Sequence, residues 1–294
     1  MSRLILGTAQ WGLNYGISNN YGITPSHEVS SILNRASSCG IQILDTAPAY
    51  GSSEKKIGEF NNNRFKVISK IPSLKDIISK KEKIKTINES VENSLSNLGV
   101  NSIFGVLFHD ANDLIKNENI AIYEALNRFK EKGLVNNIGV SIYTKDEIDI
   151  ILSSFVPDIV QLPFNILDQR LLKSGHLTKL KSLGVKIHAR SIFLQGLFHM
   201  PVDDLPDFFN PIKSVLSNLH FQAQKQGFSM NQAALSFVRD YPDIDNVLIG
   251  VESLAQVNAA IKDFSISGSF NPNISLSLDE KFLNPSKWSL HDGC

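Results

Sequence analysis

Residues 41–51 read IQILDTAPAYG, an apolar run that ends at a carboxylate and leads into a turn with a tyrosine. The run favours a short buried strand with Asp45 at its carboxyl end. Similar apolar runs recur along the chain, separated by segments with the spacing of amphipathic helices. The predicted strands are residues 4–6, 41–44, 65–69, 103–108, 137–141, 158–162, 185–189 and 246–249.

This regular alternation predicts parallel strands joined by helical crossovers, and eight such repeats close naturally into a (β/α)8 TIM barrel. A chain of 294 residues is typical of one such barrel, so we expect residues 1–294 to form a single domain. Residues 197–227 exceed an ordinary βα loop and are a candidate lid of loop and helix. We expect the tail, residues 268–294, near the barrel mouth.

The composition is that of an ordinary soluble globular protein, with 42% hydrophobic and 20% charged residues. Lys plus Arg and Asp plus Glu number 29 each, so electrostatics gives no support for nucleic-acid binding. No apolar run approaches the roughly 20 residues that span a bilayer, and no signal-peptide pattern is present. We therefore expect a cytoplasmic protein without a membrane partner. The two cysteines form no metal-binding spacing, and the oligomeric state is not indicated.

Ionisable residues close three successive predicted strands: Asp45, Lys70 and His109. In such barrels the carboxyl ends of the strands meet at one rim, which also receives Tyr50. A lysine ammonium beside a tyrosine hydroxyl favours the phenolate and makes the phenol a better proton donor. Asp45 would hold Lys70 charged, and a neutral His109 would hydrogen-bond a substrate carbonyl. Taken singly, each residue has an ordinary structural role, as helix cap, solvated cation or hydrogen-bonded histidine.

The order of these four residues resembles the aldo-keto reductase family, and the likeness extends from about residue 4 to residue 261. Further matching motifs are residues 6–8 with Gly12, residues 45–47, residues 50–52 with Glu54 and Gly58, residues 139–141 and residues 161–165. The resemblance implies a nicotinamide-dependent reductase in which Tyr50 is the general acid, Lys70 and Asp45 tune it, and His109 positions a small-molecule carbonyl substrate.

The same resemblance assigns Ser141 and Gln161 to the nicotinamide carboxamide, although a buried glutamine is also an ordinary satisfied core amide. The asparagine common after the serine is here Ile142. Where relatives place an aromatic residue under the nicotinamide, this chain has Arg190. The guanidinium is compatible with stacking there, with a substrate carboxylate or phosphate, or with an acidic neighbour. Further candidate cofactor contacts are Gly7, Thr8, Ser191 and Gly196.

Gly250 precedes a predicted helix whose amino terminus favours a phosphate, with Ser253 and Gln256 as candidate ligands. These two residues also read as a capping box, which alone explains them. Relatives that prefer NADPH carry a basic residue near position 252, whereas this chain has Glu252. A carboxylate there repels a 2′-phosphate and accepts ribose hydroxyls, so the family default of NADPH competes with NADH.

Trp11, Tyr15 and Trp288 are candidates, with His109, for the substrate pocket, although most aromatic residues simply pack. Residues 11–16 and Arg190 resemble family members of sugar or glycan metabolism, which suggests a sugar-derived carbonyl by analogy. Two other functions fit the sequence. One is a non-catalytic barrel that binds cofactor and senses redox state, which tight cofactor retention without turnover would favour. The other is an aldolase or isomerase with a Schiff base on Lys70, which borohydride trapping would favour.

Overall fold

The computed structural model describes residues 2–17, 19, 21–115, 119–274 and 278–288. In this part of the chain eight parallel strands pair in sequence order, and β8 pairs with β1 to close a barrel. The predicted TIM barrel is therefore confirmed. The strands are β1 (Leu4–Gly7), β2 (Ile43–Asp45), β3 (Lys66–Ile71), β4 (Gly105–Phe108), β5 (Ile138–Ser141), β6 (Ile159–Pro163), β7 (Lys186–Arg190) and β8 (Asn246–Gly250).

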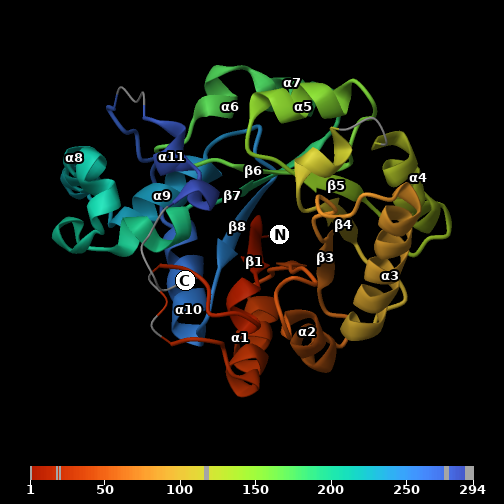
Figure 1. Ribbon diagram of the computed structural model, residues 1–294. Helices are drawn as coiled ribbons and strands as arrows, with labels where there is room; N and C mark the ends of the chain where they lie inside the picture. Colours follow the sequence, from red (N-terminus) through yellow and green to blue (C-terminus); the bar gives the residue numbers. More distant parts are fainter. Residues whose placement is uncertain (1, 18, 20, 116–118, 275–277, 289–294) are drawn as a thin grey trace.

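Helices surround the strands and bury their outer faces (Figure 1). They are α1 (Ser26–Ser38), α2 (Ser53–Asn61), α3 (Lys80–Leu98), α4 (Asn119–Glu131), α5 (Lys145–Leu152), α6 (Arg170–Lys173), α7 (His176–Ser182), α8 (Lys213–Lys225), α9 (Met230–Arg239), α10 (Leu254–Phe264) and α11 (Glu280–Leu283). Short 3-10 segments are η1 (Ala9–Trp11), η2 (Ala111–Leu114), η3 (Leu194–His199), η4 (Val202–Asp204), η5 (Asp207–Ile212) and η6 (Pro285–Lys287).

Each predicted strand coincides with an observed strand, with bounds that differ by at most two residues. One difference concerns the site, because Lys70 lies inside β3 rather than after it. Lys70 pairs in register with Leu107 of β4, so the strand continues through it to Ile71. Asp45 is the last residue of β2, as predicted, and His109 follows β4 directly.

Inside the barrel, the side chains are apolar in the middle of the strands and polar at the carboxyl ends, which form the mouth. Residues two apart in a strand point to the same side, and the small inner cluster consists of Ile68, Leu107 and Ile159. Each stands two residues before a polar residue of the site: Lys70, His109 and Gln161. The strand pleat therefore directs these polar side chains to the mouth above a packed apolar floor.

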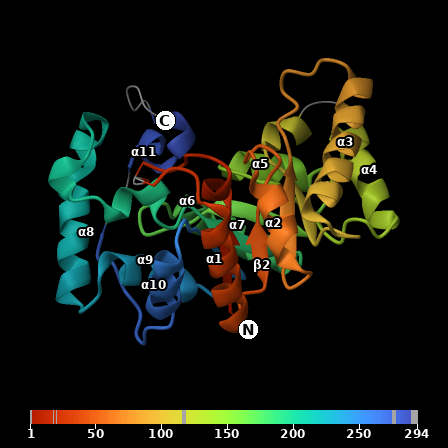
Figure 2. The same cartoon turned by 90° about the horizontal axis from the view of Figure 1, so that it is seen from below.

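The segment 197–227, proposed as a lid, forms the end of η3, then η4, η5 and α8. Helix α8 lies outside the ring of barrel helices, at the edge of the molecule (Figures 1 and 2). A lid function stays a prediction. Of the tail, residues 275–277 and 289–294 lie outside the described residues, and α11 lies at the opposite end of the molecule from the amino terminus (Figure 2). Within the described residues, no helix has the length and apolar character needed to cross a membrane.

Candidate active site

A cavity of about 770 Å³ lies at the carboxyl ends of the strands, and its lining includes the four residues of the predicted tetrad. Neighbouring strands β2, β3 and β4 carry three of them, and Tyr50 lies in the turn between β2 and α2. Parallel strands bring their carboxyl ends to one rim, which is why residues 64 positions apart, Asp45 and His109, share this wall.

Lys70 and Asp45 form a buried ion pair under the mouth. The Lys70 Nζ lies 2.5 Å from the Asp45 Oδ1, and both side chains are 3% exposed. Lys70 also donates to the Thr46 carbonyl at 2.9 Å. Burial alone would lower the pKa of Lys70, but Asp45 and Tyr50 together outweigh it, so the pKa is raised and the ammonium stays charged.

Tyr50 is held against this ammonium and against His109. The Lys70 Nζ lies 5.1 Å from the centroid of the Tyr50 ring, and the His109 ring meets Tyr50 edge-on with centroids 6.0 Å apart. The turn that carries Tyr50 packs directly on Gly12, where an added Cβ would lie 1.8 Å from the Tyr50 carbonyl oxygen. Only a glycine allows this approach, so Gly12 helps to position the phenol.

His109 is a neutral imidazole. Burial, followed by the nearby Lys70 charge, lowers the pKa of His109 to about 4. At neutral pH the ring therefore has one nitrogen that donates and one that accepts. A neutral donor beside Tyr50 is suited to binding a carbonyl oxygen.

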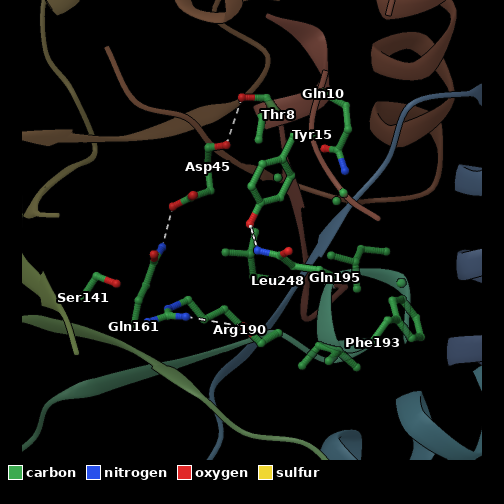
Figure 3. A pocket seen from close by; sticks show the side chains of 18 of the residues that line it. Thr8, Gln10, Tyr15, Asp45, Ser141, Gln161, Arg190, Phe193, Gln195 and Leu248 are labelled. Atoms are coloured by element: carbon green, nitrogen blue, oxygen red, sulfur yellow. Dashed lines mark hydrogen bonds between the residues drawn. The ribbon is translucent and has the colours of Figure 1, made fainter. Parts of the chain in front are cut away.

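Gln161 and Ser141 lie next to the tetrad, on β6 and β5. Gln161 is fully buried, and its Nε2 donates to the Asp45 Oδ2 (Figure 3). Its Oε1 is buried without a hydrogen-bond partner. A simple satisfied core amide would bond through both ends, so the Oε1 is suited to accept from a ligand amide. Ile142, in place of the expected asparagine, is buried.

Arg190 ends β7 and lines the same cavity. Its guanidinium carbon lies 4.1 Å from the centroid of the Tyr143 ring, and its Nη2 donates to the Ile142 carbonyl at 2.9 Å. The Nη1 donates to the Ser191 hydroxyl at 3.3 Å, while the Nε is buried without a partner. Of the three roles considered for Arg190, pairing with an acidic neighbour is not found among the residues that the structure describes.

The start of α10 differs from the phosphate site expected there. Ser253 caps the helix by accepting from the Gln256 amide at 3.2 Å, and Ser253 is absent from the cavity lining. Gln256 reaches back to Glu252, accepting from its amide and donating to its carboxylate, both at 2.9 Å. The Leu254 amide donates to the Glu28 carboxylate of α1 at 2.5 Å. These amides therefore already have acceptors, and two of the side chains here are carboxylates.

The remaining candidates divide into two groups. Gly7, Thr8, Tyr15, Ser191, Gly196 and Gly250 line the cavity, as do Glu252 and Gln256. Trp11 and Trp288 do not line it. Trp11 is fully buried, and its Nε1 donates to the Val251 carbonyl at 2.9 Å. Trp288 packs edge-on against Phe209, with centroids 4.9 Å apart. Trp11 is thus a core residue, whereas Trp288 is partly buried and its Nε1 has no hydrogen-bond partner within the described residues.

Sequence reasoning missed several residues of the cavity and one residue, Glu28, that contacts the neighbouring helix α10. Gln195 donates to the Tyr15 hydroxyl at 2.9 Å, which joins the loops after β1 and β7 across the mouth (Figure 3). Tyr143 stacks on Arg190, and Glu28 reaches α10 from 226 positions away in sequence. No local pattern distinguishes these residues. Glu280, Asn284 and Lys287 show that the tail also reaches the cavity.

Comparisons with known proteins agree with this fold. The family model of the aldo/keto reductase family matches residues 3–270. The NADH-specific methylglyoxal reductase of Escherichia coli K12 is 27% identical over an alignment 223 residues long. The match covers 67% of this chain and 65% of that protein, slightly less than two thirds of its length. Aldo-keto reductase YhdN of Bacillus subtilis 168 is 24% identical over 97% of this chain and 92% of its own. The crystal structure of the thermostable aldo-keto reductase Tm1743 with epalrestat superposes with a TM-score of 0.68 and 22% identity, covering 92% of both chains.

Proposed function

The chain belongs to the aldo/keto reductase family, and we propose that it reduces an aldehyde or ketone to an alcohol with Tyr50 as the general acid. One observation carries the proposal. The Tyr50 ring lies beside an ammonium that a fully buried carboxylate holds charged. An ammonium in this place would stabilise the phenolate that remains after the phenol transfers its proton to an alkoxide forming from a carbonyl.

Each residue of the tetrad then has a distinct task. The neutral His109 donates a hydrogen bond to the carbonyl oxygen and orients it toward Tyr50. Tyr50 transfers its proton to that oxygen as negative charge develops on it. Lys70 stabilises the phenolate that remains, and Asp45 keeps Lys70 in place.

The residues of β5 and β6 fit a nicotinamide cofactor, which supplies hydride when bound. The buried Gln161 Oε1 has no partner within the protein, and a carboxamide NH2 is the donor that it lacks. Ser141 lines the cavity on the neighbouring strand and offers a hydroxyl to the same group. Gln161 also bonds Asp45, so the carboxamide position is tied directly to the tetrad.

We propose NADH rather than NADPH as the cofactor. Glu252 lines the cavity at the start of α10, and Glu28 accepts from the first amide of this helix. Two carboxylates at this place would repel a 2′-phosphate, whereas a carboxylate readily accepts the hydroxyls of an unmodified ribose. The Escherichia coli relative is named an NADH-specific methylglyoxal reductase, which agrees with this preference.

A Schiff-base mechanism has less support. A lysine must lose its proton before its amine attacks a carbonyl, whereas the raised pKa of Lys70 keeps it protonated. Its ammonium is also saturated with contacts to Asp45, Thr46 and Tyr50. We therefore expect no adduct on Lys70 with borohydride.

The test combines cofactor binding with turnover. The wild type is titrated with NADH and NADPH by fluorescence, and a carbonyl panel is then assayed with wild type, Tyr50→Phe and Tyr123→Phe. Tyr123 stacks on Phe155, away from the cavity, and serves as the matched control. Loss of general acid catalysis should lower the turnover of Tyr50→Phe by about 100-fold or more, with unchanged cofactor affinity.

Two results would contradict the proposal. Unchanged turnover in Tyr50→Phe excludes this residue as the acid. Tight cofactor binding with no turnover of any carbonyl by the wild type favours a redox sensor instead.

A further inference from the structure

The two sides of the barrel mouth carry different residues. Strands β2, β3 and β4 bring the tetrad, whereas β5, β6 and β7 bring Ser141, Gln161 and Arg190. These last three strands are consecutive neighbours in the barrel. Arg190 also donates to the carbonyl of Ile142, the residue after Ser141, and its strand β7 pairs directly with β6, which carries Gln161; Figure 3 shows these side chains at the cavity. Any group that Ser141 and Gln161 hold is therefore close to the guanidinium.

Arg190 forms no ion pair with the residues that the structure describes. Within the described residues, no carboxylate oxygen lies within 4.0 Å of its guanidinium. Arg170, by contrast, pairs with Asp168 at 2.8 Å. The contacts of Arg190 are an aromatic ring, a carbonyl and a hydroxyl, all of them neutral. No ion pair therefore neutralises the Arg190 guanidinium within the described part of the chain.

The field of Arg190 extends across the cavity. After burial and the Lys70 charge, Arg190 contributes to the lowered pKa of His109 on the opposite wall. A charge on a ligand between these walls would experience the same field, because a partly desolvated cavity screens it poorly.

We propose that Arg190 makes this site bind the reduced nicotinamide more tightly than the oxidised one. The proposal rests on the proposed function, which places the carboxamide at Ser141 and Gln161. The ring attached to that carboxamide is neutral when reduced and carries one positive charge when oxidised. Arg190 therefore repels the oxidised ring and leaves the reduced ring unpenalised. An uncharged aromatic residue at this position would not make this distinction.

The consequence concerns the direction of the reaction. A site that disfavours the oxidised cofactor promotes its release after reduction and resists the reverse reaction. Arg190 thus adapts this barrel to reduce carbonyls rather than to oxidise alcohols. Like-charge repulsion at a few ångströms and an intermediate dielectric is large enough for at least about a tenfold difference in dissociation constant.

The experiment measures dissociation constants of NADH and NAD+ by titration calorimetry for wild type, Arg190→Gln, Arg190→Lys and Arg128→Gln. Arg128 is exposed on α4 and controls for the loss of one positive charge elsewhere. We expect NADH to bind the wild type at least about tenfold more tightly than NAD+. Arg190→Gln should bring the two constants within about threefold by removing the repulsion, whereas Arg190→Lys and Arg128→Gln should keep the wild-type preference.

Three outcomes overturn the inference. The first is that the wild type binds NADH and NAD+ with equal affinity. The second is that Arg190→Gln folds but keeps the wild-type ratio of the two dissociation constants. The third is that Arg190→Gln keeps this ratio but binds a carboxylated or phosphorylated carbonyl more weakly, which would assign Arg190 to the substrate. If the wild type binds neither cofactor, the proposed function fails as well; if it binds both equally, only the role of Arg190 fails.

Discussion

The side of the mouth that we propose to be catalytic, on β2 to β4, differs from the proposed cofactor side, on β5 to β8, in how its polar groups are satisfied. On the catalytic side, Lys70 and Asp45 bond one another and their neighbours in full burial. On the cofactor side, Gln161 and Arg190 each retain a buried atom without a partner. The buried polar groups of the first side are thus satisfied within the protein, whereas the second side keeps buried polar atoms that suit a ligand.

The largest effect is expected from Asp45→Asn, which removes the buried ion pair on the first side of the mouth. The change leaves the buried Lys70 charge without its counter-ion, so the free energy of unfolding should fall by about 3–5 kcal/mol. Turnover should fall with it. Urea denaturation and steady-state assays measure both. The double variant Asp45→Asn with Lys70→Met should regain stability but not turnover, and a single variant as stable as the wild type would contradict the account.

The second prediction concerns a buried base on the cofactor side. His188 lies two residues before Arg190 in β7, and burial lowers its pKa to about 4 from 6.5. Because the folded pKa is the lower one, stability is complete above about pH 6.5 and is lost as the pH falls toward 4. Denaturation at several pH values should show this loss, on the order of 3 kcal/mol for His188. His188→Gln should flatten the dependence and leave the part due to His109; equal slopes would exclude His188.

A smaller effect is expected from Gly12→Ala, which pushes on the turn that carries Tyr50. The added Cβ would meet the Tyr50 carbonyl, so the backbone must shift, at a cost of about 2 kcal/mol. Turnover should decrease roughly tenfold as the phenol moves from its working position. Gly99→Ala is the control, since Gly99 has a φ of +62° and no atom within 4 Å of an added Cβ. It should lose stability without losing the turnover of the folded fraction.

The smallest effect is expected from a substitution on the proposed cofactor side that changes the affinity for NADPH. Glu252→Gln removes one carboxylate at the start of α10, so NADPH should bind about fivefold more tightly while NADH affinity changes little. Fluorescence titration with both cofactors measures this. Glu124→Gln, on the exposed face of α4, should change neither constant. A gain that is equal for both cofactors would mean that Glu252 does not discriminate the 2′-phosphate.

The sequence by itself determined the barrel, the order of its strands and the grouping of Asp45, Lys70 and His109. Strand periodicity is local, and parallel topology then brings successive strand ends to one rim without further information. The Thr144 cap of α5 was also predictable, because Glu147 three residues later completes a capping box. These features depend on neighbours in sequence or on the regularity of the fold.

Only the tertiary structure decided which side chains meet across distant segments. Trp11 could be placed in the first loop, but its burial against Val251 depends on a partner 240 positions away. The Glu28 carboxylate of α1 likewise accepts from the first amide of α10, and Arg190 stacks on Tyr143 of another loop. Both contacts join segments that are distant in sequence. Such contacts depend on how helices and loops pack around the closed barrel, and packing leaves no periodic signal in the sequence.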